Sequence, residues 1–195
     1  MPVKRICLFC GANCGANPAY AQAARAVAHA AVKAGLGVVY GGGRVGLMGA
    51  IANAVLEEKG SVIGVIPHAL VEKELAHHGV TELRVVHSMH ERKWLMAELS
   101  DAFIALPGGY GTLEEFCEVL TWAQLGLHVK PLGLLNVNGF YDSFLAHIDR
   151  AIAERFVPVE NRSLFHVDDH PARLVEKLLN EHPLPARQWV SADDV

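Results

Sequence analysis

The 195-residue sequence lacks the features of a membrane protein or a nucleic-acid-binding protein. No stretch approaches the roughly 18 consecutive apolar residues that cross a bilayer, and Met1 to Arg5 lead directly into a short apolar run. The formal net charge is only −4, which provides no basic surface field for nucleic acid or an anionic membrane. We therefore expect a cytoplasmic protein, without nucleic-acid or membrane partners, that binds any phosphate through a local group of residues.

Cysteines are few as well: the sequence has four, at positions 7, 10, 14 and 117. Cys7 and Cys10 have the spacing of a metal-binding or redox pair, but there is no second such pair and no histidine at ligand spacing nearby. They lie in and just after an apolar run, which favours buried thiols. We expect no metal site, no disulfide and no cofactor.

Short, β-branched apolar segments alternate with longer segments of helical periodicity, which is typical of a parallel sheet covered on both faces. The sequence thus predicts one α/β domain over 1–182, Rossmann-like and doubly wound, with a loose tail over 183–195. The pattern fades over 68–82, where we expect a mobile flap. The predicted strands are Arg5–Phe9, Gly37–Tyr40, Ser61–Ile66, a weaker Leu83–Val86, Asp101–Leu106 and, as the last, Leu132–Asn136. The predicted helices are Pro18–Ala34, Leu47–Lys59, a short one near Leu70, Met89–Leu99, Thr112–Leu125, Tyr141–Phe156 and Pro171–Asn180.

Three glycine-rich loops follow predicted strands, over 11–17, 41–49 and 107–112. Ligands of open parallel sheets bind at such loops, where helix amino termini offer N–H groups to anions. The third loop has the clearest pattern, because its glycines allow close backbone approach and Thr112 adds a hydroxyl at the helix start. A phosphate cradle and an ordinary strand-to-helix turn both remain open from this loop alone. Neither a Walker ending nor a complete dinucleotide fingerprint is present, which disfavours an ATPase or a dehydrogenase.

Charged residues at the start of two predicted helices are candidates for the same site. Glu114 and Glu115 are favoured there by the helix dipole alone, and because neighbours point about 100° apart, at most one faces the phosphate loop. Arg92 and Lys93 lie in a first helical turn, where the dipole disfavours cations. A bound phosphate explains them, and a solvated charged face is the alternative.

At these motifs the chain resembles the LONELY GUY family of cytokinin riboside 5′-monophosphate phosphoribohydrolases, labelled "lysine decarboxylase-like" in older descriptions. The likeness spans roughly residues 4–180, in order and with family-like spacing. Nothing in the residues identifies a Schiff-base lysine beside a pyridoxal phosphate site, so the older label finds no support. The matching segments are Cys10–Ala12, Tyr40–Gly43, Gly46–Gly49, Met89–Lys93, Ser100–Glu115 and Thr121–Gly126.

The resemblance implies hydrolysis of the bond between base and ribose in N6-modified adenosine 5′-monophosphates. It assigns Glu115 and Arg92 as the catalytic pair, implies no cofactor, and implies a homodimer or higher homo-oligomer with the site near the interface. Around Glu74 the chain is more charged than is usual for the family, so the base preference is open. The implied substrate-binding residues are Glu74, Arg92, Lys93, Gly109, Tyr110, Gly111, Thr112, Leu113, Glu114, Glu115 and Thr121.

Two other functions fit the same residues. A non-enzymatic nucleotide carrier of the same fold would bind the phosphate without chemistry, although the pairing of Arg92 with Glu115 argues against it. A general AMP nucleosidase would perform the same reaction without a preference for a modified base.

Overall fold

The structure is a computed structural model that describes residues 3–73 and 75–180. Within this part the strands are β1 (Arg5–Phe9), β2 (Gly37–Tyr40), β3 (Val62–Pro67), β4 (Glu82–Val86), β5 (Ala102–Ala105), β6 (Leu132–Leu135) and β7 (Phe165–Asp168). The α-helices are α1 (Pro18–Lys33), α2 (Gly46–Glu57), α3 (His68–Val71), α4 (Met89–Glu98), α5 (Tyr110–Leu125), α6 (Asp142–Ala153) and α7 (Pro171–Asn180), with 3₁₀ turns η1 (Val137–Gly139) and η2 (Val159–Leu164). The expected tail over 183–195 lies outside the described residues.

The strands form one parallel sheet in the order β4-β3-β2-β1-β5-β6-β7. The central strand β1 is paired on both edges, with Cys7 opposite Val39 of β2 and Phe103 of β5. The chain winds outward in one direction from β1 to β4, and then in the other from β5 to β7. This reversal between β1 and β5 is the switch point at which doubly wound folds bind ligands, and it confirms the predicted α/β class.

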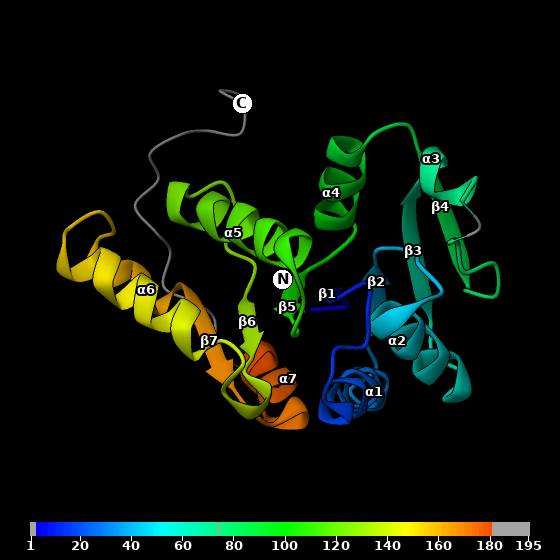
Figure 1. Ribbon diagram of the computed structural model, residues 1–195, viewed down its shortest axis with the longest axis horizontal. Helices are drawn as coiled ribbons and strands as arrows, with labels where there is room; N and C mark the ends of the chain where they lie inside the picture. The colour runs from blue at the N-terminus through cyan, green and yellow to red at the C-terminus, as the bar shows by residue number, and fades with distance from the viewer. Residues whose placement is uncertain (1–2, 74, 181–195) are drawn as a thin grey trace.

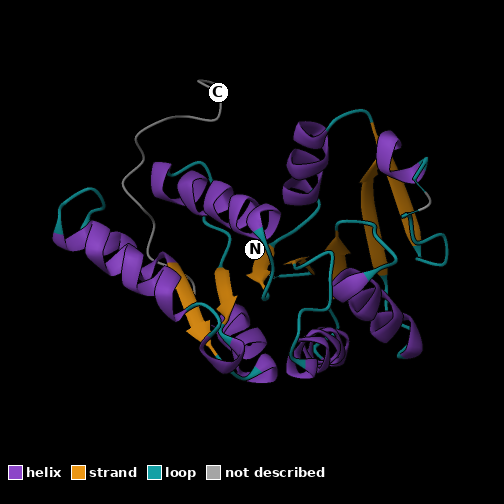
Figure 2. Cartoon of the chain, in the orientation of Figure 1, coloured by secondary structure: helices purple, strands orange, loops and turns teal. Residues whose placement is uncertain are grey.

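Helices cover both faces of the sheet (Figures 1 and 2), and each face has its own hydrophobic core. Successive side chains of a strand point to opposite faces, so Ile6 and Leu8 lie in the core beneath α1, α2 and α7. Cys7 and Phe9 lie in the other core, which is covered by α4, α5 and α6. Alternation along β1 therefore divides the apolar side chains between two layers of helices.

Most predicted elements are confirmed, including the short helix α3 and the helix Pro171–Asn180. The strand β7 is not among the predictions, because Phe165–Asp168 contains His166 and Asp168 and follows a segment without clear periodicity. Within the described residues it is an edge strand with β6 as its neighbour, and edge strands tolerate such polar residues. No helix in the described part of the chain combines the length and apolarity that a membrane crossing requires.

Candidate active site

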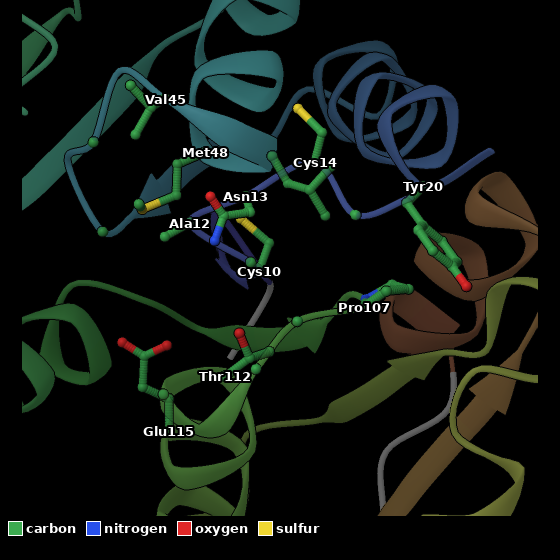
Figure 3. A pocket seen from close by; sticks show the side chains of 18 of the residues that line it. Cys10, Ala12, Asn13, Cys14, Tyr20, Val45, Met48, Pro107, Thr112 and Glu115 are labelled. Atoms are coloured by element: carbon green, nitrogen blue, oxygen red, sulfur yellow. The ribbon is translucent and has the colours of Figure 1, made fainter. Parts of the chain in front are cut away.

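A cavity of about 500 Å³ opens at the carboxyl ends of the central strands. It is walled by the loops that follow β1, β2, β3 and β5, together with the start of α5 and the buried face of α4. In Figure 3 the Glu115 carboxylate lies on the same side of the cavity as Met48 and Val45, while Tyr20 and Pro107 lie opposite. The lining residues are Cys10–Gly15, Tyr20, Gly41, Gly43, Val45, Leu47, Met48, Ile66, Leu70, Leu75, Arg92, Pro107–Gly109, Gly111, Thr112, Glu115 and Phe140.

Backbone hydrogen bonds join the three glycine-rich loops into one floor. The Gly11 N–H donates to Pro107 O at 3.1 Å, and Gly11 O accepts from the Leu47 N–H at 3.2 Å. Gly46 has φ +60°, and a Cβ there would overlap the backbone of Ala12. The predicted loops therefore depend on one another, and the glycine at position 46 allows two of them to meet.

The loop before α5 has the features of an anion site. Gly109 is the N-cap residue of this helix, and it has no side chain to accept from the first-turn N–H groups. Positions 109 and 111 both face open space, since an added Cβ would meet nothing within 4 Å at either. At Gly108, by contrast, a Cβ would overlap the buried side chain of Thr112. The loop thus presents backbone N–H groups and an open hollow at the positive end of a 16-residue helix.

The guanidinium of Arg92 is held beneath the cavity by backbone carbonyls. Nε donates to Val65 O at 3.1 Å and Nη2 donates to Gly41 O at 3.0 Å. A Cβ at position 41 would overlap Nη2, so a glycine is required there for this contact. Arg92 is only 9% exposed, so the interpretation of Arg92 as part of a solvated charged face is wrong.

Glu115 projects from α5 toward this guanidinium, and its Oε1 lies 3.7 Å from Nη1 of Arg92. The Glu115 side chain is only 11% exposed. Burial raises its pKa from 4.5 to about 7, although Arg92 opposes that shift. At neutral pH the carboxyl therefore exchanges a proton readily, which is the property of a general acid or base.

Lys93 and Glu114 lie beside this pair but do not line the cavity. Lys93 Nζ contacts the Glu114 carboxylate and donates to Glu118 Oε1 at 3.0 Å. The Lys93 side chain is only 9% exposed, so the solvated-face interpretation is also wrong for this residue. Of the two adjacent glutamates, Glu115 lines the cavity and Glu114 does not, in agreement with the expected 100° spacing.

The other predicted binding residues lie at different depths. Gly109, Gly111 and Thr112 line the cavity. Tyr110 is 94% exposed, Leu113 packs against the core beneath α5, and the exposed Thr121 donates from its hydroxyl to Cys117 O at 2.7 Å. Glu74 lies outside the described residues. The binding roles of these residues remain predictions.

The apolar wall of the cavity is a feature that the sequence patterns do not predict. Val45, Leu47 and Met48 contribute to it from the loop after β2 and the start of α2, and Leu70 and Leu75 from the segment after β3. These residues lie in loops and helix starts, where no periodicity identifies a buried face. Their signal is only an apolar residue next to a glycine-rich loop.

The structure also shows where three of the four cysteines lie. Cys7 and Cys10 are free and buried, and they belong to opposite hydrophobic cores. Cys10 and Cys14 line the cavity. Among the described residues, no group of three or more histidine, cysteine, aspartate or glutamate side chains could hold a metal ion.

Comparisons of sequence give consistent matches. A family model described as "Possible lysine decarboxylase" matches residues 48–178. The cytokinin riboside 5′-monophosphate phosphoribohydrolase of Rhodococcoides fascians is 55% identical over 161 residues, which are 82% of this chain and 81% of that protein. An enzyme of the same name from Arabidopsis thaliana is 49% identical over 191 residues, which are 95% of this chain and 84% of that protein.

Solved structures show a likeness of fold. The molybdenum cofactor carrier protein of Chlamydomonas reinhardtii has a TM-score of 0.69 and 21% identity, and the match covers 91% of this chain and 99% of that chain. The molybdenum cofactor binding protein of Rippkaea orientalis also has a TM-score of 0.69, with 20% identity, and covers 90% of this chain and 95% of that chain. At such identities the likeness extends to the fold alone.

Proposed function

The chain belongs to the family of cytokinin riboside 5′-monophosphate phosphoribohydrolases, and from this premise we propose that it hydrolyses the N-glycosidic bond of adenosine 5′-monophosphates, including N6-modified ones. The products are the free base and ribose 5-phosphate. One observation carries the proposal: Glu115, a carboxyl whose pKa burial raises to about 7, faces the same cavity as the amino terminus of α5.

The phosphate binds at the amino terminus of α5. Arg92 is the only cationic side chain among the described residues that line the cavity, and its Nε and Nη2 already donate to backbone carbonyls. The N–H groups of Gly109–Thr112 and the Thr112 hydroxyl are therefore left to hold the phosphate. The open space at Gly109 and Gly111 supports this placement.

Glu115, one helical turn beyond the phosphate on α5, and Arg92 on α4 act at the ribose. Departure of the base leaves positive charge on the ribose ring, and water attacks the anomeric carbon from the opposite face. Ionised Glu115 stabilises this charge and accepts the proton of the attacking water, while the base leaves with the electron pair of the broken C–N bond and takes up a proton from solvent. The remaining Nη1 group of Arg92, 3.7 Å from Glu115, orients the carboxylate and donates to the substrate. Arg92 stays protonated throughout, because a guanidinium is not a proton donor at neutral pH.

The apolar wall supports a modified base. Val45, Met48, Leu70 and Leu75 line the cavity, and Met48 and Val45 are on the Glu115 side (Figure 3). An alkyl group on N6 of adenine would bury apolar surface against such a wall and gain roughly 0.8 kcal/mol per buried CH₂. We therefore expect N6-isopentenyl-AMP to be hydrolysed faster than AMP at equal low concentration.

A cytoplasmic homodimer completes the proposal. Trp94 on α4 and Tyr110 on α5 are 57% and 94% exposed, and Trp122 and Leu120 on α5 are only half-buried. A second copy that covered these helices would bury this apolar surface and would lie next to the helices that carry Arg92 and Glu115. Sedimentation at micromolar concentration tests the dimer, and fractionation of the producing cells tests the compartment.

Product analysis tests the reaction. Purified protein is incubated separately with AMP, with N6-isopentenyl-AMP and with adenosine, and bases and sugars are separated by chromatography. The expected result is free base with ribose 5-phosphate from both nucleotides and little reaction with adenosine. Nucleotides that bind but survive intact would instead establish a carrier. Equal kcat/KM for the two nucleotides would establish a general AMP nucleosidase.

A further inference from the structure

The side chain of Lys93 joins two helices through a cluster that lies outside the cavity. Its Nζ contacts Glu114 and donates to Glu118 Oε1 at 3.0 Å. The two carboxylates are four residues apart, so they lie on one face of α5. Lys93 is the neighbour of Arg92 on α4, and Glu114 is the neighbour of Glu115 on α5. Two members of the cluster are therefore adjacent in sequence to the two proposed catalytic residues.

In the amino-terminal half of α4 the buried side chain is that of Arg92, whose hydrogen bonds go to Val65 O and Gly41 O and not to α5. Met96 and Ala97, in its carboxyl-terminal half, are 1% and 8% exposed and pack on the sheet. Met89, in the first turn, is 46% exposed. Near this end, Lys93 supplies ion pairs to α5, and its side chain is almost fully withdrawn from water.

We propose that Lys93 and Glu118 are positioning residues, which hold α4 against α5 and so fix the separation and electrostatic balance of Arg92 and Glu115. This inference rests on the proposed function, and it assigns Glu118 a part that the sequence motifs do not give it. In this inference Lys93 affects the reaction through Glu115 and Arg92, and it does not contact the substrate directly.

The charges around Glu115 make the inference specific. On α4 these are Arg92 and Lys93, and on α5 Glu114 and Glu118. The neutral thiols of Cys7, in β1, and Cys10, just after it, also face Glu115. Both cations lower the pKa of Glu115, and both glutamates raise it, beyond the larger effect of burial. Burial alone would lower the pKa of Lys93, but its hydrogen bonds with Glu114 and Glu118 raise it, so this lysine stays charged throughout an assay near neutral pH.

Two single variants should therefore move the pH profile in opposite directions. Lys93→Met removes a cation and the tether, so the acidic limb of kcat/KM should move to higher pH by at least about half a unit. Its kcat should also fall about tenfold with KM for AMP little changed, because small displacements of reacting groups are costly. Glu118→Gln removes an anion and keeps a hydrogen-bond acceptor for Lys93. Its acidic limb should move to lower pH, with kcat within about threefold of the wild type.

The double variant Lys93→Met/Glu118→Gln restores the original sum of charges, so its acidic limb should return toward that of the wild type while kcat remains low. Glu176→Gln, at an exposed position of α7, is the matched control for a glutamate-to-glutamine change and should leave the profile unchanged. Circular dichroism and melting curves establish that each variant is folded. If Lys93→Met does not fold, the shift of the acidic limb in Glu118→Gln alone tests whether the cluster affects the pKa of Glu115.

A second measurement separates this inference from the proposed function. The Glu115 carboxyl is titrated by NMR in protein labelled with carboxyl-¹³C glutamate, with its signal assigned by comparison with Glu115→Gln. Opposite shifts of this titration in the two single variants support the cluster even if no nucleotide is hydrolysed, which would overturn only the proposed function. Unchanged titrations would overturn the inference. So would an increase in KM with unchanged kcat in Lys93→Met, which would show that Lys93 contacts the substrate.

Discussion

Glu115→Gln tests the site through stability as well as activity. Glutamine has nearly the shape of a protonated glutamic acid but cannot ionise. If burial raises the pKa of Glu115 to about 7, the folded protein favours the neutral form, and ionisation at higher pH acts against folding. The substitution removes that penalty, so it should stabilise the protein at alkaline pH while it abolishes turnover.

The size of the effect follows from the shift. The unfolded chain ionises Glu115 near 4.5 and the folded protein near 7. A group with a raised pKa contributes stability that is complete below 4.5 and is lost as pH rises through 7. At about 1.4 kcal/mol per pKa unit, the shift corresponds to roughly 3 kcal/mol at pH 8, which is about 6 to 12 °C in Tm for a domain of this size.

Thermal melts of the wild type, Glu115→Gln and the control Glu176→Gln at pH 4.5 and pH 8 provide the assay. We expect the first variant to match the wild type at pH 4.5 and to melt several degrees higher at pH 8, while it still binds AMP and yields no free base. A lower Tm than the wild type at pH 8 would refute the reasoning, since it would show that ionised Glu115 is stabilised by the fold. Retained turnover would remove Glu115 from the chemistry.

Three further substitutions have expected outcomes. Arg92→Ala should lower kcat about 100-fold, the cost of losing an oriented donor in a buried site, and steady-state kinetics on folded protein checks this; unchanged kinetics would contradict its role. Gly111→Ala should leave Tm unchanged or raise it, because alanine favours a helix by roughly 0.5 to 1 kcal/mol relative to glycine. Its methyl group should enter the proposed phosphate hollow and raise KM for AMP. An unchanged KM would argue against that hollow. Asp168→Asn removes a buried carboxylate bound by Arg173 and Lys177, contacts that hold the pKa of Asp168 below its usual range. Its Tm should fall by roughly 3 to 6 °C near pH 7, and the difference should shrink as pH falls below 4 and vanish only below the lowered pKa of Asp168 in the folded protein; a constant difference would refute the charge argument.

Much of the fold could be predicted because its cores depend on local patterns. The apolar runs Ile6–Phe9 and Val62–Pro67 are buried on both faces, and such strands are recognisable without knowledge of their neighbours. Phe165–Asp168 escapes prediction because an edge strand is defined by pairing with β6, a contact that no local pattern records. The helix α5 begins two residues earlier than expected, since Gly109 with its extended backbone already serves as N-cap.

The site is predictable in its loops and less so in its contacts. The glycines and Thr112 could be identified from the sequence because close approach to an anion requires these residue types. The acceptors that hold Arg92 could not be identified, because Gly41 O and Val65 O belong to segments 51 and 27 residues away. The sequence predicts Lys93 near a phosphate, because a cation at a helix start needs a compensating negative charge. In the structure the carboxylates of Glu114 and Glu118 on α5 provide that charge.

The distribution of charges supports separate regions of the cavity for binding the phosphate and for catalysis at the ribose. The proposed phosphate hollow at the amino terminus of α5 carries no described cationic side chain, whereas Glu115, one turn further along α5, and Arg92 on α4 lie together in a mostly buried environment. A cation at the phosphate would attract substrate and product equally, because ribose 5-phosphate keeps that group. A buried carboxylate near the ribose acts chiefly where positive charge develops, which is the condition for stabilising a transition state more than a ground state. The raised pKa of Glu115 is then the stability cost of that placement, and its removal by Glu115→Gln should increase stability and abolish catalysis in the same molecule.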